Sequence, residues 1–476
     1  MKARKTLHLE KMETTDRNRR ENDKLTNNIY KNYLADNFDI DEKVLDFVEG
    51  CEEELGEWFR EADEICGIAQ MRVLKAFQDN HVNDTHFGWN TGYGYDDAGR
   101  EAVEKVYASV FHTEAALVRP NIVNGTHAIS TALFGLLKPG EQLLYVTGAP
   151  YDTLETVIGK TSGKNGREDE DPGEFRGTLL DYGILYDEVP LNDRFDVDIE
   201  AIVKALKPET KVVAIQRSTG YDWRPAISLA SIERVCSAVK EARPDIIIFA
   251  DNCYGEFVDV KEPTELGVDV MAGSLIKNPG GGLALSGGYI VGPEKLIERI
   301  SYRLTCPGIG AECGLTFGQN RGILQGLFLA PQVVNSAVKG AMLCSLVYSK
   351  LGFQTCPKPF TKRSDIVEAV EFRDADKMVA FCQSIQSASP IDSYVTPIPW
   401  DMPGYDDQVV MAAGNFVQGS SIELSADGPM REPYIGYFQG GLTYQHSRFG
   451  VIKSLDTLVK RGLADVTEGR SEGKTE

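Results

Sequence analysis

The chain of 476 residues has little that would tie it to a membrane, to nucleic acid or to a secretory route. No apolar run approaches the roughly 18 residues that a membrane span needs, and the polar first 30 residues predict no secretory signal. Positive charge is scarce, with 50 Lys and Arg against 71 Asp and Glu and a net charge of −21. This balance argues against nucleic acid or an anionic membrane as a partner.

Paired cysteines and clustered histidines are also missing. The nine cysteines are scattered without a Cys-x-x-Cys pair, which favours reduced thiols and a cytoplasmic protein. Of the six histidines, His81, His86 and His446 could suggest a metal site, but no ligand spacing supports one. We therefore expect no metal.

Apolar runs and helical patterns alternate through most of the chain, which is too long for a single core. This alternation predicts an α/β fold with a mostly parallel sheet. The expected strands are 115–118, 142–147, 211–216, 246–250, 270–276 and 287–291, then 367–373 and 420–425. The glycine-rich segment 305–331 is expected to form an active-site flap, followed by a long apolar helix over 332–350.

One stretch in this pattern carries an acid and an amine at neighbouring strand ends. The run 246–250 ends in Asp251, and the run 270–276 ends in Lys277, ahead of Pro279 and three glycines. Open α/β sheets bind ligands at the edge where their strands end. Pyridoxal phosphate needs such a pair, because an amine bonds to its aldehyde and a carboxylate keeps its ring nitrogen protonated. The alternative is an unrelated acid and a surface lysine.

Other residues along the chain suit the same cofactor. Gly125 and Thr126 stand where a turn leads into a helix, and the free N–H groups of a helix start bind phosphate. Seen alone, this motif favours a plain threonine helix cap over a phosphate site. Tyr151 offers a ring that can stack on a flat cofactor, and Ser274 offers a hydroxyl to the phosphate. Their order and spacing together favour pyridoxal phosphate.

This order resembles the pyridoxal-phosphate-dependent enzymes of the aspartate aminotransferase fold (fold type I), and among them the cystathionine-metabolism branch. In that branch a tyrosine precedes the phosphate glycine by about thirty residues, as Tyr95 precedes Gly125, and a Ser-x-x-Lys motif carries the cofactor lysine, as in Ser274 to Lys277. Four segments are similar to methionine γ-lyase-related proteins labelled for aluminium resistance: 91–101, 124–128, 423–431 and 440–446.

The resemblance implies a large domain with a mostly parallel seven-stranded sheet and a smaller α+β C-terminal domain. It divides the chain into a helical arm with an active-site loop (1–100), a cofactor-binding domain (101–335) and a small domain (336–476). It also implies a homodimer or homotetramer whose active sites are shared between subunits.

The resemblance assigns roles to individual residues. The implied catalytic residues are Lys277, Tyr151 and Asp251. The implied cofactor-binding residues are Lys277, Asp251, Gly125, Thr126, His127, Tyr151, Ser274, Tyr95 and Arg217. The family's arginine after the tyrosine is replaced by Asp97, so Arg100 is considered as a substitute.

The substrate carboxylate needs a bidentate partner, which arginine supplies better than lysine. Arg431 is our choice, because the C-terminal domain of the family contributes that residue, and Tyr95 is expected to contact the substrate from a second subunit. Arg217 is the next candidate for the carboxylate. Arg431 could instead be an ordinary surface arginine.

The activity that the resemblance implies is elimination from a sulfur-containing amino acid, giving a keto acid, ammonia and a thiol. Transamination or aldol cleavage would use the same residues, and a non-enzymatic stress-related protein that binds pyridoxal phosphate is a further alternative. Ser274 and Lys277 also match a serine acyl-enzyme motif, but its companions Lys-Thr-Gly and Ser-Asp-Asn are absent from the sequence.

Overall fold

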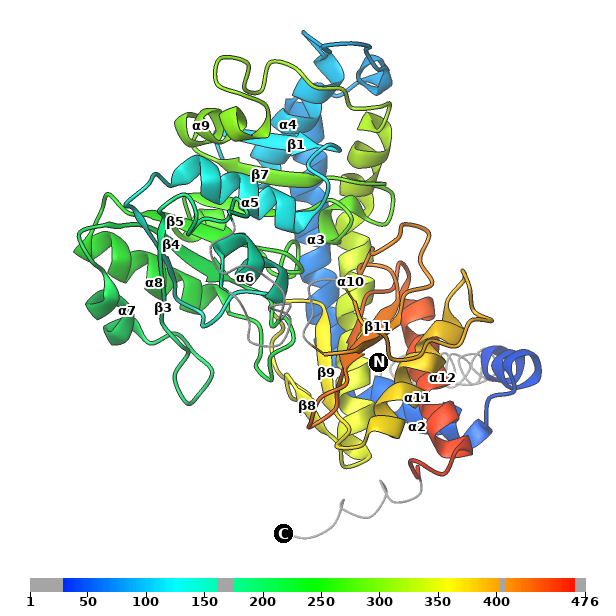
Figure 1. Cartoon of the computed structure of the whole chain (residues 1–476). Helices are drawn as coiled ribbons and strands as arrows, with labels where there is room; N and C mark the ends of the chain where they lie inside the picture. The colour runs from blue at the N-terminus through cyan, green and yellow to red at the C-terminus, as the bar shows by residue number, and fades with distance from the viewer. Residues whose placement is uncertain (1–28, 161–174, 403–406, 467–476) are drawn as a thin grey trace, which may run out of the picture.

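The computed structural model describes residues 29–160, 175–402 and 407–466, so residues 1–28 of the expected arm lie outside it. Two sheets organise the described chain, with the larger one at the upper left of Figure 1 and the smaller one at the lower right. The larger sheet contains β1 (Ala115–Arg119), β2 (Gln142–Tyr145), β3 (Leu185–Glu188), β4 (Thr210–Gln216), β5 (Ile247–Asp251), β6 (Val270–Ser274) and β7 (Gly288–Gly292). The smaller sheet contains β8 (Gln354–Cys356), β9 (Val367–Glu371), β10 (Val409–Ala412), β11 (Ser425–Pro429) and β12 (Ile435–Gln439).

Helices cover both sheets. The α-helices are α2 (Glu42–Glu54), α3 (Gly56–Asp79), α4 (Ala98–Val110), α5 (Gly125–Leu136), α6 (Asp152–Ile158), α7 (Ile199–Ala205), α8 (Leu229–Ala242), α9 (Glu294–Leu304), α10 (Asn320–Lys350), α11 (Ala375–Ala388) and α12 (Tyr444–Lys460). Three short 3-10 helices are η1 (Asp84–Phe87), η2 (Pro263–Leu266) and η3 (Asn278–Gly280).

The larger sheet has the strand order β1-β7-β6-β5-β4-β2-β3. Its neighbours from β3 to β6 are parallel, and β7 runs antiparallel to both β6 and β1. The prediction of a mostly parallel seven-stranded sheet is therefore confirmed. Because β4, β5 and β6 are parallel, their carboxyl ends meet at one edge, which is where the acid and the amine were expected.

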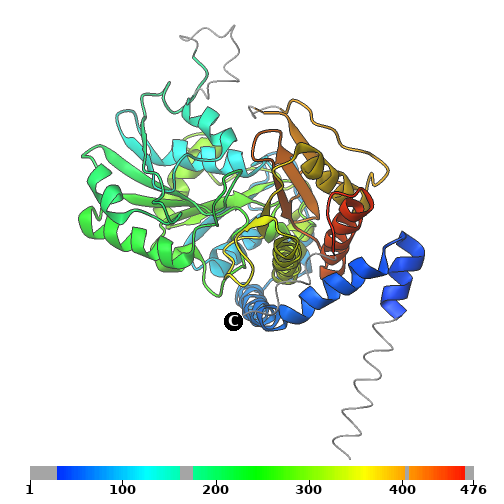
Figure 2. The ribbon, with the colours of Figure 1, turned by 90° about the horizontal axis from the view of Figure 1, so that it is seen from below.

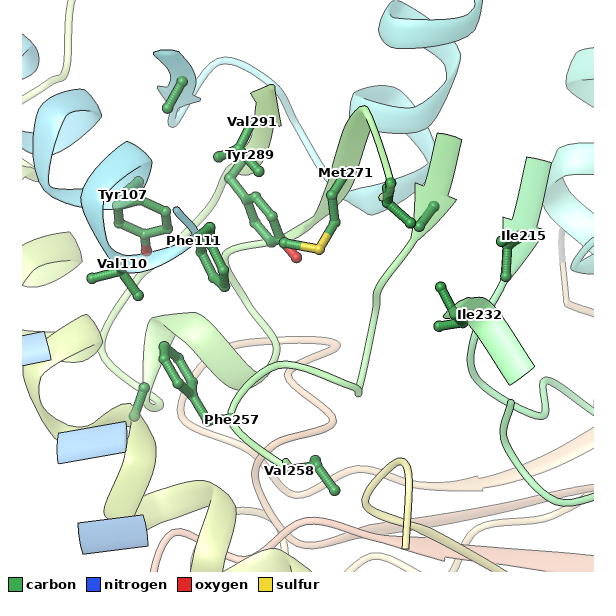
Figure 3. Close-up of a cluster of buried hydrophobic side chains, with 14 of the residues drawn as sticks. Tyr107, Val110, Phe111, Ile215, Ile232, Phe257, Val258, Met271, Tyr289 and Val291 are labelled. Carbon is green, nitrogen blue, oxygen red and sulfur yellow. The ribbon is translucent and has the colours of Figure 1, made fainter. Parts of the chain in front are cut away.

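Alternating apolar residues place helices on both faces of this sheet. Leu144 of β2 packs in the cluster that holds α3, α4, α8 and α10, whereas its neighbour Leu143 packs with α5 and α9. Figure 3 shows part of the first cluster, where Phe111, at the end of α4, stacks on Tyr289 of β7 with ring centres 5.2 Å apart. The continuous apolar strands that the sequence displays are thus buried on both sides.

The smaller sheet is antiparallel throughout, in the order β10-β11-β12-β9-β8. The helices α2, α11 and α12 pack with it in a second core. The strand expected at 420–425 lies instead at 425–429, and the pattern did not reveal β8, β10 or β12.

The helix α10 joins the two cores. It begins at Asn320, inside the segment expected to be a flap, and lies beside α3; Figure 2 shows both helices nearly end-on. It sends Val334 and Ala337 into the core of the larger sheet and Leu343 and Cys344 into that of the smaller one. By length and composition α10 could cross a membrane, but 72% of its most apolar window is buried inside the protein. The domain boundary predicted at 335/336 falls within this helix and stays a prediction.

Candidate active site

A cavity of about 240 Å³ lies between the carboxyl edge of the larger sheet and one face of the smaller sheet. Six residues singled out in the sequence line it: Gly125, Thr126, Tyr151, Asp251, Ser274 and Lys277. The structure therefore brings together segments that are up to about 150 residues apart in the chain.

The acid and the amine come from adjacent strands. Asp251 is the last residue of β5 and is in register with Gln216 of β4 and Ala272 of β6, and Lys277 lies in the turn shortly after the end of β6. Burial raises the pKa of the Asp251 carboxyl, and the positive charge of Lys277 opposes that rise. A positive partner thus favours the ionised form of this buried carboxyl. The Lys277 ammonium lies 4.0 Å from the centre of the Tyr254 ring, where it makes a cation–π contact.

Small residues let the start of α5 approach the end of β6. A side chain at Gly125 would place its Cβ 3.3 Å from both Cys253 Sγ and Ser274 Cβ, so glycine is what fits here. The first N–H groups of α5, at Gly125 and Thr126, have no acceptor within the helix. Thr126 Oγ1 is also 2.9 Å from Thr153 Oγ1. These donors and hydroxyls form a suitable end of the cavity for a phosphate.

Two residues that the sequence reading missed position the aromatic walls. The backbone N–H of Tyr151 donates to Gln216 Oε1 at 2.6 Å, which fixes where α6 begins. Tyr254, in the loop after β5, shares a 2.7 Å hydrogen bond with Ser421 from the opposite side of the cavity. Both Gln216 and Tyr254 follow apolar strands at the ligand edge, and that position was the available signal.

The opposite wall is one face of the smaller sheet. Val367 of β9, Asp427 of β11 and Tyr437 and Gln439 of β12 line the cavity from there. Gln439 Nε2 donates to Asp427 Oδ2 at 3.3 Å. Burial raises the pKa of the Asp427 carboxyl to about 7, although hydrogen bonds from Tyr221 and Gln439 limit the rise. This wall presents an acid and hydrogen-bonding groups.

The chain is similar to known proteins in sequence and in fold. A family model for methionine γ-lyase matches residues 44–459. The chain belongs to the methionine γ-lyase family. The uncharacterized protein YnbB of Bacillus subtilis is 51% identical over 404 residues, which cover 85% of this chain and 94% of YnbB.

A solved structure from Clostridium novyi, described as a carbon–sulfur lyase involved in aluminium resistance, superposes with a TM-score of 0.84. It is 49% identical and the match covers 89% of this chain and 98% of that one. The pyridoxal-phosphate-dependent protein YhfS of Escherichia coli shares the fold, with a TM-score of 0.54 at 18% identity over 83% of this chain and 96% of YhfS.

Membership of the methionine γ-lyase family establishes a pyridoxal-phosphate-dependent protein of fold type I. It also establishes the general class of activity, a carbon–sulfur lyase with a small amino-acid substrate. The residues present fit the cofactor. Lys277 would supply the amine, Asp251 would supply the acid for the ring nitrogen, and the absence of a side chain at Gly125 would leave the start of α5 open to the phosphate.

Arg217 lies behind this family site rather than in its cavity. Its fully buried guanidinium donates to Asn252 Oδ1, to the Gly255 carbonyl and to Asp259 Oδ2 at 2.7–3.0 Å. The structure does not support the expected contact of Arg217 with cofactor or substrate. Instead the arginine holds the loop that follows Asp251, and so it fixes the acid indirectly.

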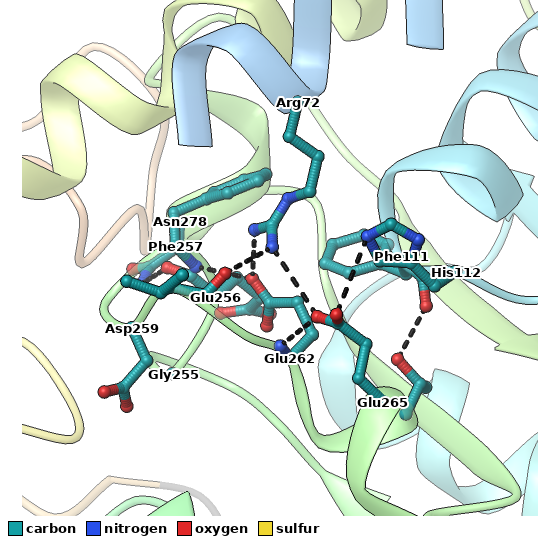
Figure 4. Close-up of polar contacts among 12 residues, drawn as sticks. Arg72, Phe111, His112, Gly255, Glu256, Phe257, Asp259, Glu262, Glu265 and Asn278 are labelled. Atoms are coloured by element: carbon teal, nitrogen blue, oxygen red, sulfur yellow. Dashed lines mark hydrogen bonds and ion pairs between the residues drawn. The ribbon is translucent and has the colours of Figure 1, made fainter. Parts of the chain in front are cut away.

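A second buried ion pair holds the same loop. Arg72 of α3 binds Glu262 with 2.8 Å between Nη2 and Oε1, as Figure 4 shows, and Glu262 also accepts from the Phe257 N–H. Nearby, Glu256 Oε1 accepts from the Tyr289 hydroxyl at 2.7 Å, and burial raises the pKa of Glu256 to about 8. The cofactor side of the cavity therefore rests on buried charged groups.

Arg431 also lies outside the cavity. Its side chain is 46% exposed, pairs with Asp407 at 3.5 Å and donates to the Tyr221 carbonyl at 3.4 Å. It follows the end of β11, whereas Asp427, inside β11, faces the cavity. In a single chain the structure thus offers an aspartate at the position where the sequence reading expected an arginine.

The remaining expected contacts lie elsewhere in the single chain. His127 is half-buried and its Nδ1 accepts from the Val123 N–H at 3.1 Å. Tyr95 is 54% exposed and stacks on Tyr93 with ring centres 5.3 Å apart. Arg100 donates to the carbonyls of Gly94, Gly314 and Glu312, so in the single chain it joins two loops.

Proposed function

We propose that the protein is a cytoplasmic pyridoxal-phosphate-dependent lyase that cleaves the carbon–sulfur bond of a sulfur-containing amino acid by β- or γ-elimination. The observation that carries the proposal is the shared cavity of Lys277, Asp251 and the start of α5, in a chain of the methionine γ-lyase family. The bond between carbon and sulfur breaks, the sulfur leaves as a thiol, and water converts the remaining unsaturated amine to a keto acid and ammonia.

The residues of this chain divide the work. When bound, the cofactor accepts the electron pair left at the substrate α-carbon. The Lys277 amine takes the α-proton, as a general base must lie within reach of the proton that it removes. The Asp251 carboxylate holds the proton on the ring nitrogen, and Tyr151 stacks on the ring and assists proton transfer. Gly125, Thr126 and Ser274 hold the phosphate.

The proposal includes a homodimer or homotetramer with shared active sites. Tyr95 and its neighbours Trp89 and Tyr93 are exposed aromatic side chains on one loop, and such residues are enriched in protein interfaces. From a second subunit, Tyr95 would complete the phosphate and substrate contacts. Sedimentation equilibrium of the native protein tests this part, and a monomer at working concentration would contradict it.

The cofactor assignment is tested on the purified protein. We expect an absorption band of bound pyridoxal phosphate that disappears on borohydride reduction. Lys277→Ala should be colourless and should lose activity by about 10³-fold or more, since both the covalent attachment and the base are removed. Lys295→Ala, which removes an exposed lysine of α9, is the matched control and should keep colour and activity.

The reaction is tested by screening sulfur amino acids for release of both a keto acid and a thiol. Simultaneous release supports elimination. Transfer of the amino group without thiol would indicate a transaminase, and aldehyde release would indicate aldol cleavage. Bound cofactor without turnover of any sulfur amino acid would contradict the lyase proposal and favour a non-enzymatic role.

A further inference from the structure

The wall contributed by the smaller sheet is a built polar surface. Asp427 of β11 and Tyr437 of β12 are register partners, and Gln439 of β12 is the register partner of Val367 of β9. Residues paired in this way, and residues two apart on one strand, point to the same face of a sheet. All four therefore face the cavity together, opposite the residues that suit the cofactor.

Two polar atoms of this wall lack a partner. Asp427 is 7% exposed and Tyr437 2% exposed. Asp427 Oδ1 and Tyr437 Oη have no hydrogen bond within residues 29–160, 175–402 and 407–466. A buried polar atom without a partner is costly, and such atoms in a cavity indicate a ligand that completes them.

The charge of the wall selects among ligands. Lys277 is the one cationic side chain that lines the cavity in the described part of the chain, and it belongs to the cofactor side. The guanidinium groups of Arg217 and Arg431 are engaged elsewhere. A carboxylate placed against Asp427 would meet a like charge, whereas an ammonium would supply both the charge and the hydrogen bonds.

We propose that Asp427 determines specificity by binding an ammonium group on the sulfur-bound arm of the substrate, with Tyr437 as its hydrogen-bonding companion. The substrate class is then thioether amino acids with a cationic arm. This inference rests on the proposed lyase function. The pKa of Asp427, raised to about 7 by burial, is consistent with it, because a bound ammonium would stabilise the ionised carboxylate.

A matched pair of substrates isolates the arm. S-aminoethyl-L-cysteine and S-propyl-L-cysteine have arms of equal length and differ in an ammonium against a methyl group. We expect the holoenzyme to prefer the aminoethyl compound in kcat/KM by about 10- to 100-fold, the range of a hydrogen bond to a charged group. Asp427→Asn should bring the ratio close to one while turnover of the propyl compound is retained. Asp376→Asn, an exposed aspartate of α11, is the control and should keep the ratio.

Binding gives a readout that does not depend on elimination. L-lysine and L-α-aminoheptanoic acid have the same two arms without a sulfur, and their binding to the holoenzyme is followed by the change in cofactor absorption. L-lysine should bind more tightly by a similar factor, and Asp427→Asn should remove the difference.

The outcomes separate the inference from the lyase proposal. Preferential, Asp427-dependent binding of L-lysine without elimination from any sulfur amino acid would overturn the lyase function and support the cation site. Elimination from both cysteine derivatives at equal rates would overturn the cation site and leave the lyase function standing. An equal loss for both arms in Asp427→Asn would place the residue against the common amino-acid portion and overturn the inference.

Discussion

The two walls of the cavity differ in whether their polar groups have partners. The wall from the larger sheet combines Asp251 and Lys277, an acid and an amine of opposite charge, and it is backed by buried ion pairs such as Arg217 with Asp259. The wall from the smaller sheet has an acid, Asp427, with an unpartnered oxygen beside the unpartnered hydroxyl of Tyr437.

This difference separates chemistry from selectivity. The first wall matches what pyridoxal phosphate requires whatever the substrate. The second wall lines the rest of the cavity, and its unpartnered polar atoms gain hydrogen bonds only when a ligand is present. Substitutions on the first wall should therefore change turnover for all substrates alike, and substitutions on the second should change the order of substrates.

Among the substitutions that compare the two walls, the largest effect is expected at Asp251. Asp251→Asn should lower kcat by about 10²- to 10³-fold, because the carboxylate no longer stabilises the protonated ring. The ratio between S-aminoethyl- and S-propyl-L-cysteine should be unchanged. Steady-state kinetics on both compounds measures this, with Asp245→Asn, an exposed aspartate just before β5, as the control. Retained kcat with an altered substrate ratio would break the division between the walls.

The support behind the first wall should respond to pH. Glu256 has an ordinary pKa of 4.5 when unfolded and about 8 when folded, because burial penalises its charge. Between these values the folded protein holds a proton that the unfolded chain releases. The free energy of unfolding should therefore fall as pH rises from about 4.5 to 8. Glu256→Gln should remove this component, roughly 4 kcal/mol over that window.

Urea unfolding at several pH values from 5 to 9 tests the Glu256 prediction. The variant should match the wild type near pH 5 and exceed it near pH 8. The control is Glu294→Gln, at an exposed position of α9. A wild type whose stability rises through this window, with no difference from Glu256→Gln, would show that the carboxyl is ionised in the folded state.

The smallest effect is expected on the second wall at Tyr437. Tyr437→Phe should raise KM for the aminoethyl compound by about 2- to 10-fold with little change in kcat, since one neutral hydrogen bond is lost. The ligand-free protein should be no less stable, because the hydroxyl has no partner in the described residues. Thermal unfolding and kinetics measure both, and Tyr434→Phe, outside the cavity lining, is the control. A lower kcat with unchanged KM would assign Tyr437 to the chemistry instead.

Much of the first wall could be predicted from the sequence because its logic is local. Apolar strands that end in Asp251 and before Lys277 show both the sheet and its ligand edge. The structure differs from the expectation where two adjacent residues point to different sides of the strand end. Gln216 ends β4 and lines the cavity, whereas the adjacent Arg217 points behind it, since successive side chains alternate. The expectation for Arg217 rested on the family resemblance and on the ability of arginine to bind a carboxylate through two hydrogen bonds.

The second wall was harder to predict because tertiary pairing overrides local preference. The sequence Ala426-Asp-Gly-Pro429 has the composition of a turn, but in β11 it pairs with strands on both sides. The strand expected at 420–425 was therefore displaced, and Asp427 was passed over for Arg431. The short apolar runs that form β10 and β12 do not show from sequence alone which strands they pair with, and that pairing creates this face.

Tertiary contacts also override local preference in the flap expected at 305–331, because the second half of this segment is helical. One of its glycines serves packing, because a Cβ at Gly326 would meet the Gly280 carbonyl oxygen at 2.1 Å. Gly326 thus lets α10 approach the turn that follows Lys277. From the sequence alone, a glycine in such a segment suggests that the helix is interrupted. Only the structure shows the close neighbour that requires a residue without a side chain.

The position of α10 has a consequence for how the protein unfolds. Its 31 residues, about 46 Å long at 1.5 Å per residue, are shared by both hydrophobic cores. If one sheet unfolded alone, the apolar surface of α10 that packs against it would become exposed to water. The same helix would still be part of the core of the other sheet. Proteins with two cores commonly melt in separate steps; here the shared helix favours one cooperative transition, so that damage to either half is felt by the whole chain.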